Sequence, residues 1–289
     1  MDLRQLEYVV GIVDHGGFTR AAAALHVSQP ALSEGVARLE AELGVELFHR
    51  LPRVVPTAAG EALLDPARQI LRDVAVLHAS VAAVRQLDGG TLDLVALPTL
   101  AVDPLAAHVG AFRRAHPAVT VRVHQPEELA ALTRLVRAGT AELGLTELPV
   151  ADDTLESRPL ATQELVAVLP PESPLARRSR IGLGALAEIP LVLLPPGTST
   201  RAIVDAAFAE VGRSPTIAVE IDQREALVPM VLAGAGAAIV PSPLATQARA
   251  LGAVMLRITP TLRRTIGFVW RPGPLSPAAR RFLELDPDA

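Results

Sequence analysis

The residue types that most often carry out catalysis are sparse in this chain, and their spacing fits no enzyme site. The 289 residues include no Cys, which excludes a disulfide framework, a thiolate metal site and a cysteine nucleophile. No HxxxH or other metal-ligand spacing joins the seven histidines, His15, His26, His49, His78, His108, His116 and His124. A GxSxG elbow and a phosphate-binding loop are missing, and Gly234-x-Gly236 lacks the third glycine of a dinucleotide fingerprint. We therefore expect no enzymatic activity, no metal and no cofactor.

Polar side chains with an informative spacing occur near the N-terminus, on short helical patterns. After a first helix that ends at Gly16-Gly17, Thr19 is suited to cap a second helix and Ser28 a third. One face of the third helix is apolar and the opposite face is polar or small: Leu32, Val36, Leu39 and Leu43 point inward, and Gln29, Ser33, Ala37 and Glu40 point outward. Two short helices, a tight turn and an outward polar face are typical of a helix-turn-helix, whose second helix reads base edges.

The residues that follow favour this interpretation over an ordinary helical hairpin, which the periodicity alone fits equally well. Phe48-His49-Arg50 and Arg53 to Pro56 predict two short strands around an Arg-bearing turn. Such a wing is able to reach phosphates. Thr57 is then suited to cap another helix.

A longer helix is predicted for residues 59–87, where apolar side chains recur in alternating steps of four and three. This is the a/d pattern of a coiled coil, and it runs through Leu63, Ala67, Ile70, Val74, Leu77, Val81 and Val84. We expect a dimer contact from all of these except the small Ala67. The alternative is an amphipathic helix that lies on the core of its own chain. Pro66 is expected to bend the helix early.

Strand-like and helical runs alternate from residue 91 onward, which is typical of an α/β fold with parallel sheets. The expected strands are Leu92–Leu97, Val119–His124, Leu143–Thr146, Leu165–Leu169, Leu191–Leu194, Ile217–Ile221, Ala237–Val240, Val254–Ile258 and Ile266–Trp270. The expected helices include Pro104–Ala115, Glu127–Ala138, Arg201–Val211, Glu225–Ala233 and Pro277–Leu285. This length allows two subdomains, each with its own sheet.

Candidate ligand contacts follow several of these strands, on the side where open α/β sheets bind ligands. They are Pro98, Thr99, Leu100, Thr146, Thr198, Ser199, Thr200, Arg201 and Gln223. The segment Gly197–Arg201 opens a helix, whose free amides suit an anion. Plain helix capping explains any single hydroxyl better, but the set as a whole predicts a site for a small carboxylate-bearing metabolite.

The N-terminal residues closely resemble the LysR-type transcriptional regulators. The resemblance lies in "LRQLEYVVGIVDHGGFTRAAAALHVSQPALSEGVARLEAELGVELFHR" and in "PTAAGEALL" behind it, and it is dense over roughly 65 residues. The resemblance implies that Gln29, Pro30 and Ser33 face base edges. It implies phosphate contacts for Thr19, Ser28, Arg38, Arg50 and Arg53, and Arg20 and Glu34 complete the predicted DNA-binding set.

The same resemblance implies the fold of the whole chain and its partners. We expect a winged helix-turn-helix in residues 1–58, a dimerisation helix in 59–90, and a two-lobed α/β effector-binding domain in 91–289 similar to type 2 periplasmic binding proteins. Lobe I would hold residues 91–162 and 265–289, and lobe II residues 163–264, with crossings near Ala161–Glu164 and Arg263–Thr265. The expected partners are operator DNA, a small-molecule effector, a second copy in a homodimer or homotetramer, and RNA polymerase if the protein is an activator.

One departure from the family pattern affects DNA recognition. Family members usually carry a basic or polar pair where this chain has Glu34-Gly35. Phosphates repel a glutamate, although a glutamate is able to accept a hydrogen bond from a cytosine amino group. Gly35 is expected to weaken the helix by up to about 1 kcal/mol relative to alanine.

Charge and composition bound the remaining alternatives. The net charge is −4, all 27 basic residues are Arg, and residues 1–58 carry five Arg against seven acids. This acidic balance supports one alternative, a degenerate regulator that dimerises and binds a metabolite or protein without DNA. An α/β enzyme with a helical appendage is the other alternative, and it lacks a catalytic constellation. The N-terminus lacks a signal-peptide layout, and prolines and glycines interrupt the longest uncharged run, Ala226–Ala248. We expect a cytoplasmic protein with no membrane partner.

Overall fold

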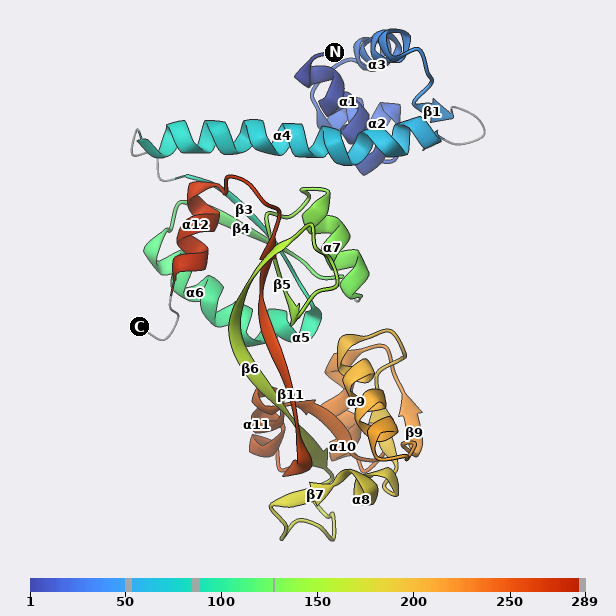
Figure 1. Cartoon of the computed structure of the whole chain (residues 1–289), viewed down its shortest axis with the longest axis vertical. Helices are drawn as coiled ribbons and strands as arrows, with labels where there is room; N and C mark the ends of the chain where they lie inside the picture. The colour runs from blue at the N-terminus through green and yellow to red at the C-terminus, as the bar shows by residue number, and fades with distance from the viewer. Residues whose placement is uncertain (50–53, 85–88, 127, 286–289) are drawn as a thin grey trace.

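A computed structural model describes residues 1–49, 54–84, 89–126 and 128–285. The chain forms three bodies stacked along its long axis (Figure 1). A small helical unit lies at one end, a long helix crosses beneath it, and two α/β lobes follow one below the other.

The N-terminal unit packs three helices, α1 (Leu3–Asp14), α2 (Phe18–Ala24) and α3 (Gln29–Leu43). Asp2 caps α1 in a capping box with Gln5. The predicted cap of α3 is confirmed, because the Ser28 side chain accepts a hydrogen bond from the Ala31 amide at 3.3 Å. The predicted cap of α2 is wrong: the helix begins one residue early, at Phe18, and follows Gly17, whose φ of 138° favours glycine.

The core of this unit takes Leu6, Val9 and Ile12 from α1, whereas Val10 and Val13 are only partly covered. Leu43, expected to point inward, is exposed because it is the last residue of α3. Leu32, Val36 and Leu39 of α3 are fully buried as predicted.

The predicted wing strands are present as β1 (Phe48–His49) and β2 (Val55–Pro56), which pair antiparallel. The expected turn with Arg50 and Arg53 lies outside the described residues. Thr57 caps the next helix as predicted, since its hydroxyl accepts from the Gly60 amide at 3.1 Å. That hydroxyl also donates to the Glu46 carbonyl at 2.7 Å.

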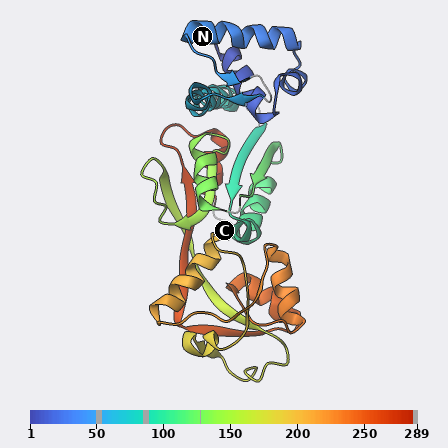
Figure 2. The same ribbon diagram turned by 90° about the vertical axis from the view of Figure 1, so that its right-hand side faces the viewer.

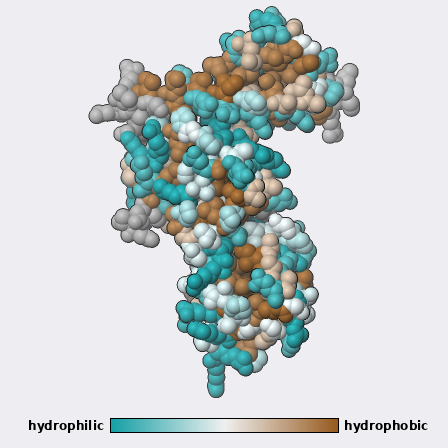
Figure 3. Space-filling view, viewed as in Figure 1, coloured by the Kyte–Doolittle hydropathy of each residue, from teal (hydrophilic) through white to brown (hydrophobic). Residues whose placement is uncertain are grey.

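The long helix α4 (Ala58–Val84) has two sets of apolar side chains. One set packs against the rest of the chain, and the other lies on the surface. Leu64, Ala67 and Val76 are buried within the chain, so Ala67 does not belong to the exposed stripe. Ile70, Leu77 and Val81 are 40%, 60% and 56% exposed. Leu63 and Val74 are partly buried, and the Val84 side chain lies outside the described residues. Apolar side chains gather along α4 on its side away from the lobes (Figure 3).

One mixed sheet runs through both lobes, in place of the two parallel sheets expected. Its strand order is β10 (Ala238–Pro241), β6 (Glu156–Leu169), β11 (Val254–Trp270), β5 (Leu143–Leu148), β3 (Gly90–Ala96) and β4 (Val119–His124), and β7 (Arg180–Gly182) also pairs with β11. The β3–β4, β3–β5 and β7–β11 pairs are parallel. The others are antiparallel, because β6 and β11 run in opposite directions through both lobes.

The two long strands, β6 and β11, both run from one lobe into the other. In β6 and β11, Gln163 pairs with Arg264 and Thr162 with Thr265. Figure 2 shows these strands descending side by side from one lobe into the other. The two short strands expected at Val254–Ile258 and Ile266–Trp270 are therefore parts of one strand, β11.

Helices cover the sheet in each lobe. Lobe I carries α5 (Pro98–Leu100), a π-helical turn at Ala101–Leu105, α6 (Ala106–Ala115), α7 (Leu129–Arg137) and α12 (Pro277–Glu284). Lobe II carries α8 (Leu183–Ala187), α9 (Ser199–Glu210), α10 (Leu227–Leu232) and α11 (Ser242–Ala250), with the parallel pair β8 (Leu191–Leu193) and β9 (Ile217–Glu220). The elements β7, α8 and α11 were not expected from the sequence. No helix in the described part of the chain is long and apolar enough to cross a membrane.

Candidate DNA interface and effector cleft

The outward face of α3 carries most of the predicted DNA contacts. Ser28, Gln29, Pro30, Glu34 and Arg38 are exposed, and Ser33 is half-buried. Thr19 and Arg20 of α2 are exposed beside them, and the Arg20 guanidinium donates to the Gly16 carbonyl. Predicted contacts Arg50 and Arg53 lie outside the described residues. The structure thus exposes these side chains on the second helix of the helix-turn-helix, and their contacts with DNA stay a prediction.

Gly35 has a packing role that the sequence did not reveal. It is buried, and a Cβ atom at this position would lie 2.7 Å from two ring carbons of Tyr8. Gly35 therefore affects stability in two opposite ways: it weakens α3 as a helix, and it allows α3 to pack closely on α1. A larger residue would push α3 away from α1, so glycine permits their close approach.

The second site is a cleft between the lobes, formed by adjoining cavities. One cavity has an open volume of about 770 Å³ and lies between Pro98 and Thr99 of lobe I and Pro241 and Leu244 of lobe II. Another, of about 940 Å³, extends to the loop before α9. Arg224 lines both and brings a cation to the cleft.

The structure brings six of the nine predicted effector residues to the cavity walls: Pro98, Thr99, Thr198, Thr200, Arg201 and Gln223. Ser199 also faces the space between the lobes, with its Oγ 3.5 Å from the Arg264 guanidinium. Leu100 and Thr146 are fully buried and line none of these cavities. Thr146 does not end its strand, since β5 continues to Leu148.

Arg201 is held by its own lobe rather than facing solvent. Its guanidinium contacts Asp205 at 2.8 Å, Glu220 at 3.0 Å and the Leu194 carbonyl at 2.8 Å. Burial alone would lower the Arg201 pKa, but these two carboxylates more than offset it, so that the pKa is raised. Arg201 therefore fastens the start of α9 to the sheet.

Arg264 is the central polar residue of the cleft, and the sequence analysis did not select it. It is 2% exposed and donates to Gln163 Oε1 at 2.7 and 3.0 Å and to Thr99 Oγ1 at 3.2 Å. Burial lowers its pKa, whereas the nearby Glu147 carboxylate acts in the opposite direction. In the sequence, Arg264 stood out only by its position between two expected strands, where the chain was expected to return from lobe II to lobe I.

Hydrogen bonds around Arg264 join the two lobes. Gln163 Nε2 donates to the Asp103 carboxylate at 3.0 Å and to the Asp103 carbonyl at 3.1 Å. Arg264 contacts Thr99, which lines the cleft in lobe I, and Ser199, which is the first residue of α9 in lobe II. The Arg264 guanidinium therefore touches a residue from each lobe at the point where the strands cross.

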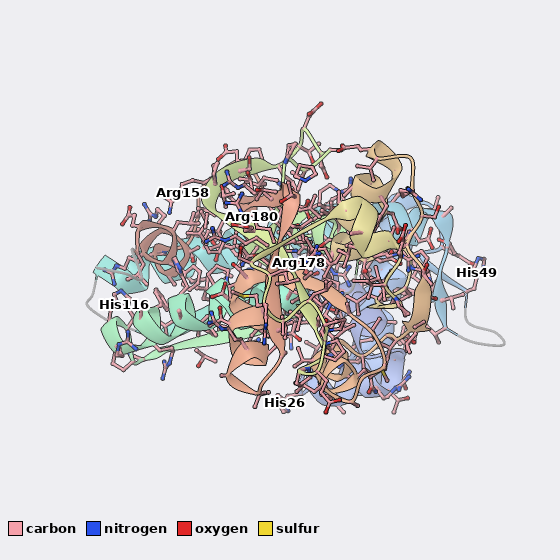
Figure 4. The ribbon with its side chains drawn as sticks, turned by 90° about the horizontal axis from the view of Figure 1, so that it is seen from below. His26, His49, His116, Arg158, Arg178 and Arg180 are labelled. Atoms are coloured by element: carbon pink, nitrogen blue, oxygen red, sulfur yellow. The ribbon has the colours of Figure 1, made fainter. Side chains whose placement is uncertain are left out.

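No group of three or more His, Asp or Glu residues in the described ranges is arranged to hold a metal ion. Figure 4 shows His26, His49 and His116 at separate edges of the molecule.

A winged helix-turn-helix, a long helix with an exposed apolar stripe and a two-lobed domain with a polar cleft define a ligand-responsive DNA-binding regulator. Comparison with known proteins gives its family. Residues 3–61 match the model "Bacterial regulatory helix-turn-helix protein, lysR family", and residues 85–285 match "LysR substrate binding domain". The chain belongs to the LysR family of transcriptional regulators, and it is not an enzyme.

Individual relatives resemble the chain over nearly its whole length. The DNA-binding transcriptional dual regulator OxyR of Escherichia coli is 31% identical over 99% of this chain and 93% of its own. A RuBisCO operon transcriptional regulator of Allochromatium vinosum is 30% identical, over 98% of this chain and 95% of its own. A full-length OxyR variant from Pseudomonas aeruginosa superposes with a TM-score of 0.82 at 26% identity, over 98% and 93% of the two chains. CbnR in complex with its target DNA gives a TM-score of 0.69 at 27% identity, over 98% of each chain.

Proposed function

We propose that this LysR-family regulator binds operator DNA through α3 and the wing and senses a small carboxylate-bearing metabolite in the cleft between its lobes. The observation that carries the effector proposal is the Arg264 cluster, in which Thr99 from lobe I and Ser199 from lobe II meet one buried guanidinium. A ligand bound there would contact both lobes at once. Its binding free energy would therefore depend on how the lobes are arranged.

The cavity walls combine charged, polar and apolar groups. Arg224 brings a cation to this cavity, whereas Asp103 and Glu225 bring carboxylates, so we place the ligand carboxylate beside Arg224 and the Thr99 hydroxyl. Pro98, Val102, Pro241, Pro243 and Leu244 form the apolar wall of the same cavity. Pockets of this composition bind small organic molecules, with a few polar groups that set their orientation.

Thiol oxidation is not the sensing chemistry of this chain, because the chain has no Cys. Several relatives are named hydrogen peroxide-inducible genes activators. We propose reversible ligand binding for this protein instead.

Calorimetric titration of the full chain with small organic acids tests the effector site. Thr99→Val removes the hydroxyl that accepts from Arg264 and that we expect to donate to the ligand. The loss of one ligand hydrogen bond, worth about 0.5–1.5 kcal/mol, should weaken binding roughly three- to tenfold. Thr133→Val, on α7 and outside the cavity walls described above, is the matched control and should bind like the wild type. Equal binding by the wild type and Thr99→Val would place the ligand elsewhere.

The remaining assignments concern oligomerisation and transcription. The exposed stripe of Ile70, Leu77 and Val81 supports a homodimer through α4, which a second interface would extend to a homotetramer. RNA polymerase is the further partner if the protein is an activator. The degenerate-regulator alternative draws support from the net acidic charge of residues 1–58, and a failure to bind DNA would favour it.

A further inference from the structure

Glu34 is an acidic residue on the face of α3 that the proposed function turns toward DNA. It lies one turn after Pro30 and one turn before Arg38, and all three side chains are exposed. Phosphate groups repel a carboxylate, so an acid at this position weakens binding to every sequence unless it finds a hydrogen-bond donor on the DNA.

The Glu34 carboxylate differs in its contacts from the other acids of α3 in the part of the chain that the structure describes. The other two glutamates of α3 have structural roles: Glu40 Oε1 accepts from the Leu47 amide at 2.8 Å, and Glu42 pairs with the N-terminal amine. Within the described ranges, no ion pair or hydrogen bond reaches the Glu34 side chain. Folding therefore does not explain this acid, whereas it does explain its two neighbours.

Packing of the next residue fixes the direction in which this part of α3 faces. Gly35 is buried against the Tyr8 ring, and its carbonyl accepts a 3.5 Å hydrogen bond from the Gln5 side chain. Successive helix residues are rotated by about 100°. With Gly35 turned into the core, Ser33, Glu34 and Arg38 stay on the outer surface.

The chemistry of base edges selects one partner for a carboxylate in the major groove. Guanine and thymine present acceptors there, and adenine presents its amino group beside the N7 acceptor. Cytosine presents its N4 amino donor without a neighbouring acceptor. We infer that Glu34 determines operator specificity by accepting a hydrogen bond from the N4 amino group of a cytosine. This inference rests on the proposed function, since it requires α3 to lie in the major groove.

Selection from a randomised duplex library tests the inference, with the full-length wild type and Glu34→Gln compared in parallel. The wild type should select a C·G pair at one position of each half-site. Glu34→Gln should prefer A·T there, because a carboxamide pairs with both N6 and N7 of adenine. Changing the selected C·G to T·A should weaken wild-type binding about tenfold and Glu34→Gln binding by less than twofold.

Glu7→Gln is the matched control, because it removes the same charge from an exposed position on α1. It should leave the selected sequence unchanged. The inference is overturned if Glu34→Gln binds all duplexes more tightly by the same factor and selects the wild-type sequence, since Glu34 would then only repel phosphates. A wild type that selects no sequence at all would overturn the proposed function as well.

Discussion

At the scale of single residues, the role of a side chain in this protein depends on what packs against it. Gly35 was expected to weaken α3, yet it is the residue that lets α3 approach the Tyr8 ring of α1. Arg201 was expected to contact a ligand, yet Asp205 and Glu220 hold its guanidinium. The Asp205 partner follows from helix periodicity, because it lies one turn after Arg201. Tyr8 and Glu220 are distant in sequence from Gly35 and Arg201, and only the fold brings them near.

Replacing Gly35 by Ala should destabilise the N-terminal unit, although alanine favours helices by about 1 kcal/mol. The added methyl group would overlap the Tyr8 ring, and overpacking costs about 1–3 kcal/mol, so the net change should be unfavourable or close to zero. Gly110→Ala in α6 is the control, since the nearest atom to its added Cβ is a flexible Arg114 nitrogen at 3.7 Å. Urea unfolding should show a gain in stability for Gly110→Ala only. An equal gain for both variants would contradict the packing role.

The candidate sites were predictable to different degrees for the same physical reason. Exposed residues on one helix, such as Gln29 and Arg38, follow from periodicity, and the structure places them on one surface. The cleft joins segments far apart in sequence, so helix-start and strand-end signals found Thr99 and Ser199 but missed Arg264. Arg264 lies in the middle of a 17-residue strand that sequence patterns divided into two.

At the scale of secondary-structure elements, local signals identified most helices and strands, and long-range pairing set their lengths. Polar and arginine residues between Ile258 and Ile266 interrupt the apolar pattern, so they predicted a break in the strand. The structure keeps this segment extended because it pairs with β6 across a register shift between Arg257 and Leu262. Periodicity within one segment does not record a partner strand that is about one hundred residues away.

The helix α4 carries the prediction on oligomerisation. A Leu77→Asp, Val81→Asp double variant should convert the dimer into a monomer, because it places charges in the exposed apolar stripe. Light scattering gives the mass, and circular dichroism shows whether the variant remains folded. Leu251→Asp is the control, an equally exposed apolar residue on lobe II, and should keep the wild-type mass. A folded double variant with the wild-type mass would assign the main interface to the lobes.

Arg72 also ties α4 to the effector domain. Its guanidinium donates to the carbonyls of Gly139 and Thr140, the latter at 3.0 Å, and lies 3.8 Å from the Asp93 carboxylate. One turn earlier on the same helix, Arg68 pairs with Asp14 of the N-terminal unit. The helix thus contacts both the DNA-binding unit and lobe I through side chains one turn apart.

At the scale of the whole molecule, β6 and β11 and the polar contacts around Arg264 join the two lobes. Arg72 fastens lobe I to α4. Lobe II lies at the opposite end of the molecule from α3 (Figure 1). A ligand in the cleft would change how lobe II sits against lobe I, and α4 would pass the change toward the DNA-binding unit. This arrangement supports a regulator whose DNA binding responds to an effector.

Binding of the full chain to the DNA flanking its own gene, measured by fluorescence anisotropy against salt concentration, tests this account most directly. We predict tighter binding to that DNA than to a random duplex, with affinity that falls as salt rises. Arg38→Gln should weaken binding to both duplexes alike and reduce the salt slope by about one unit, as expected for the loss of one phosphate contact. Binding of the wild type that does not exceed its binding to a random duplex, even at low salt, would contradict the account.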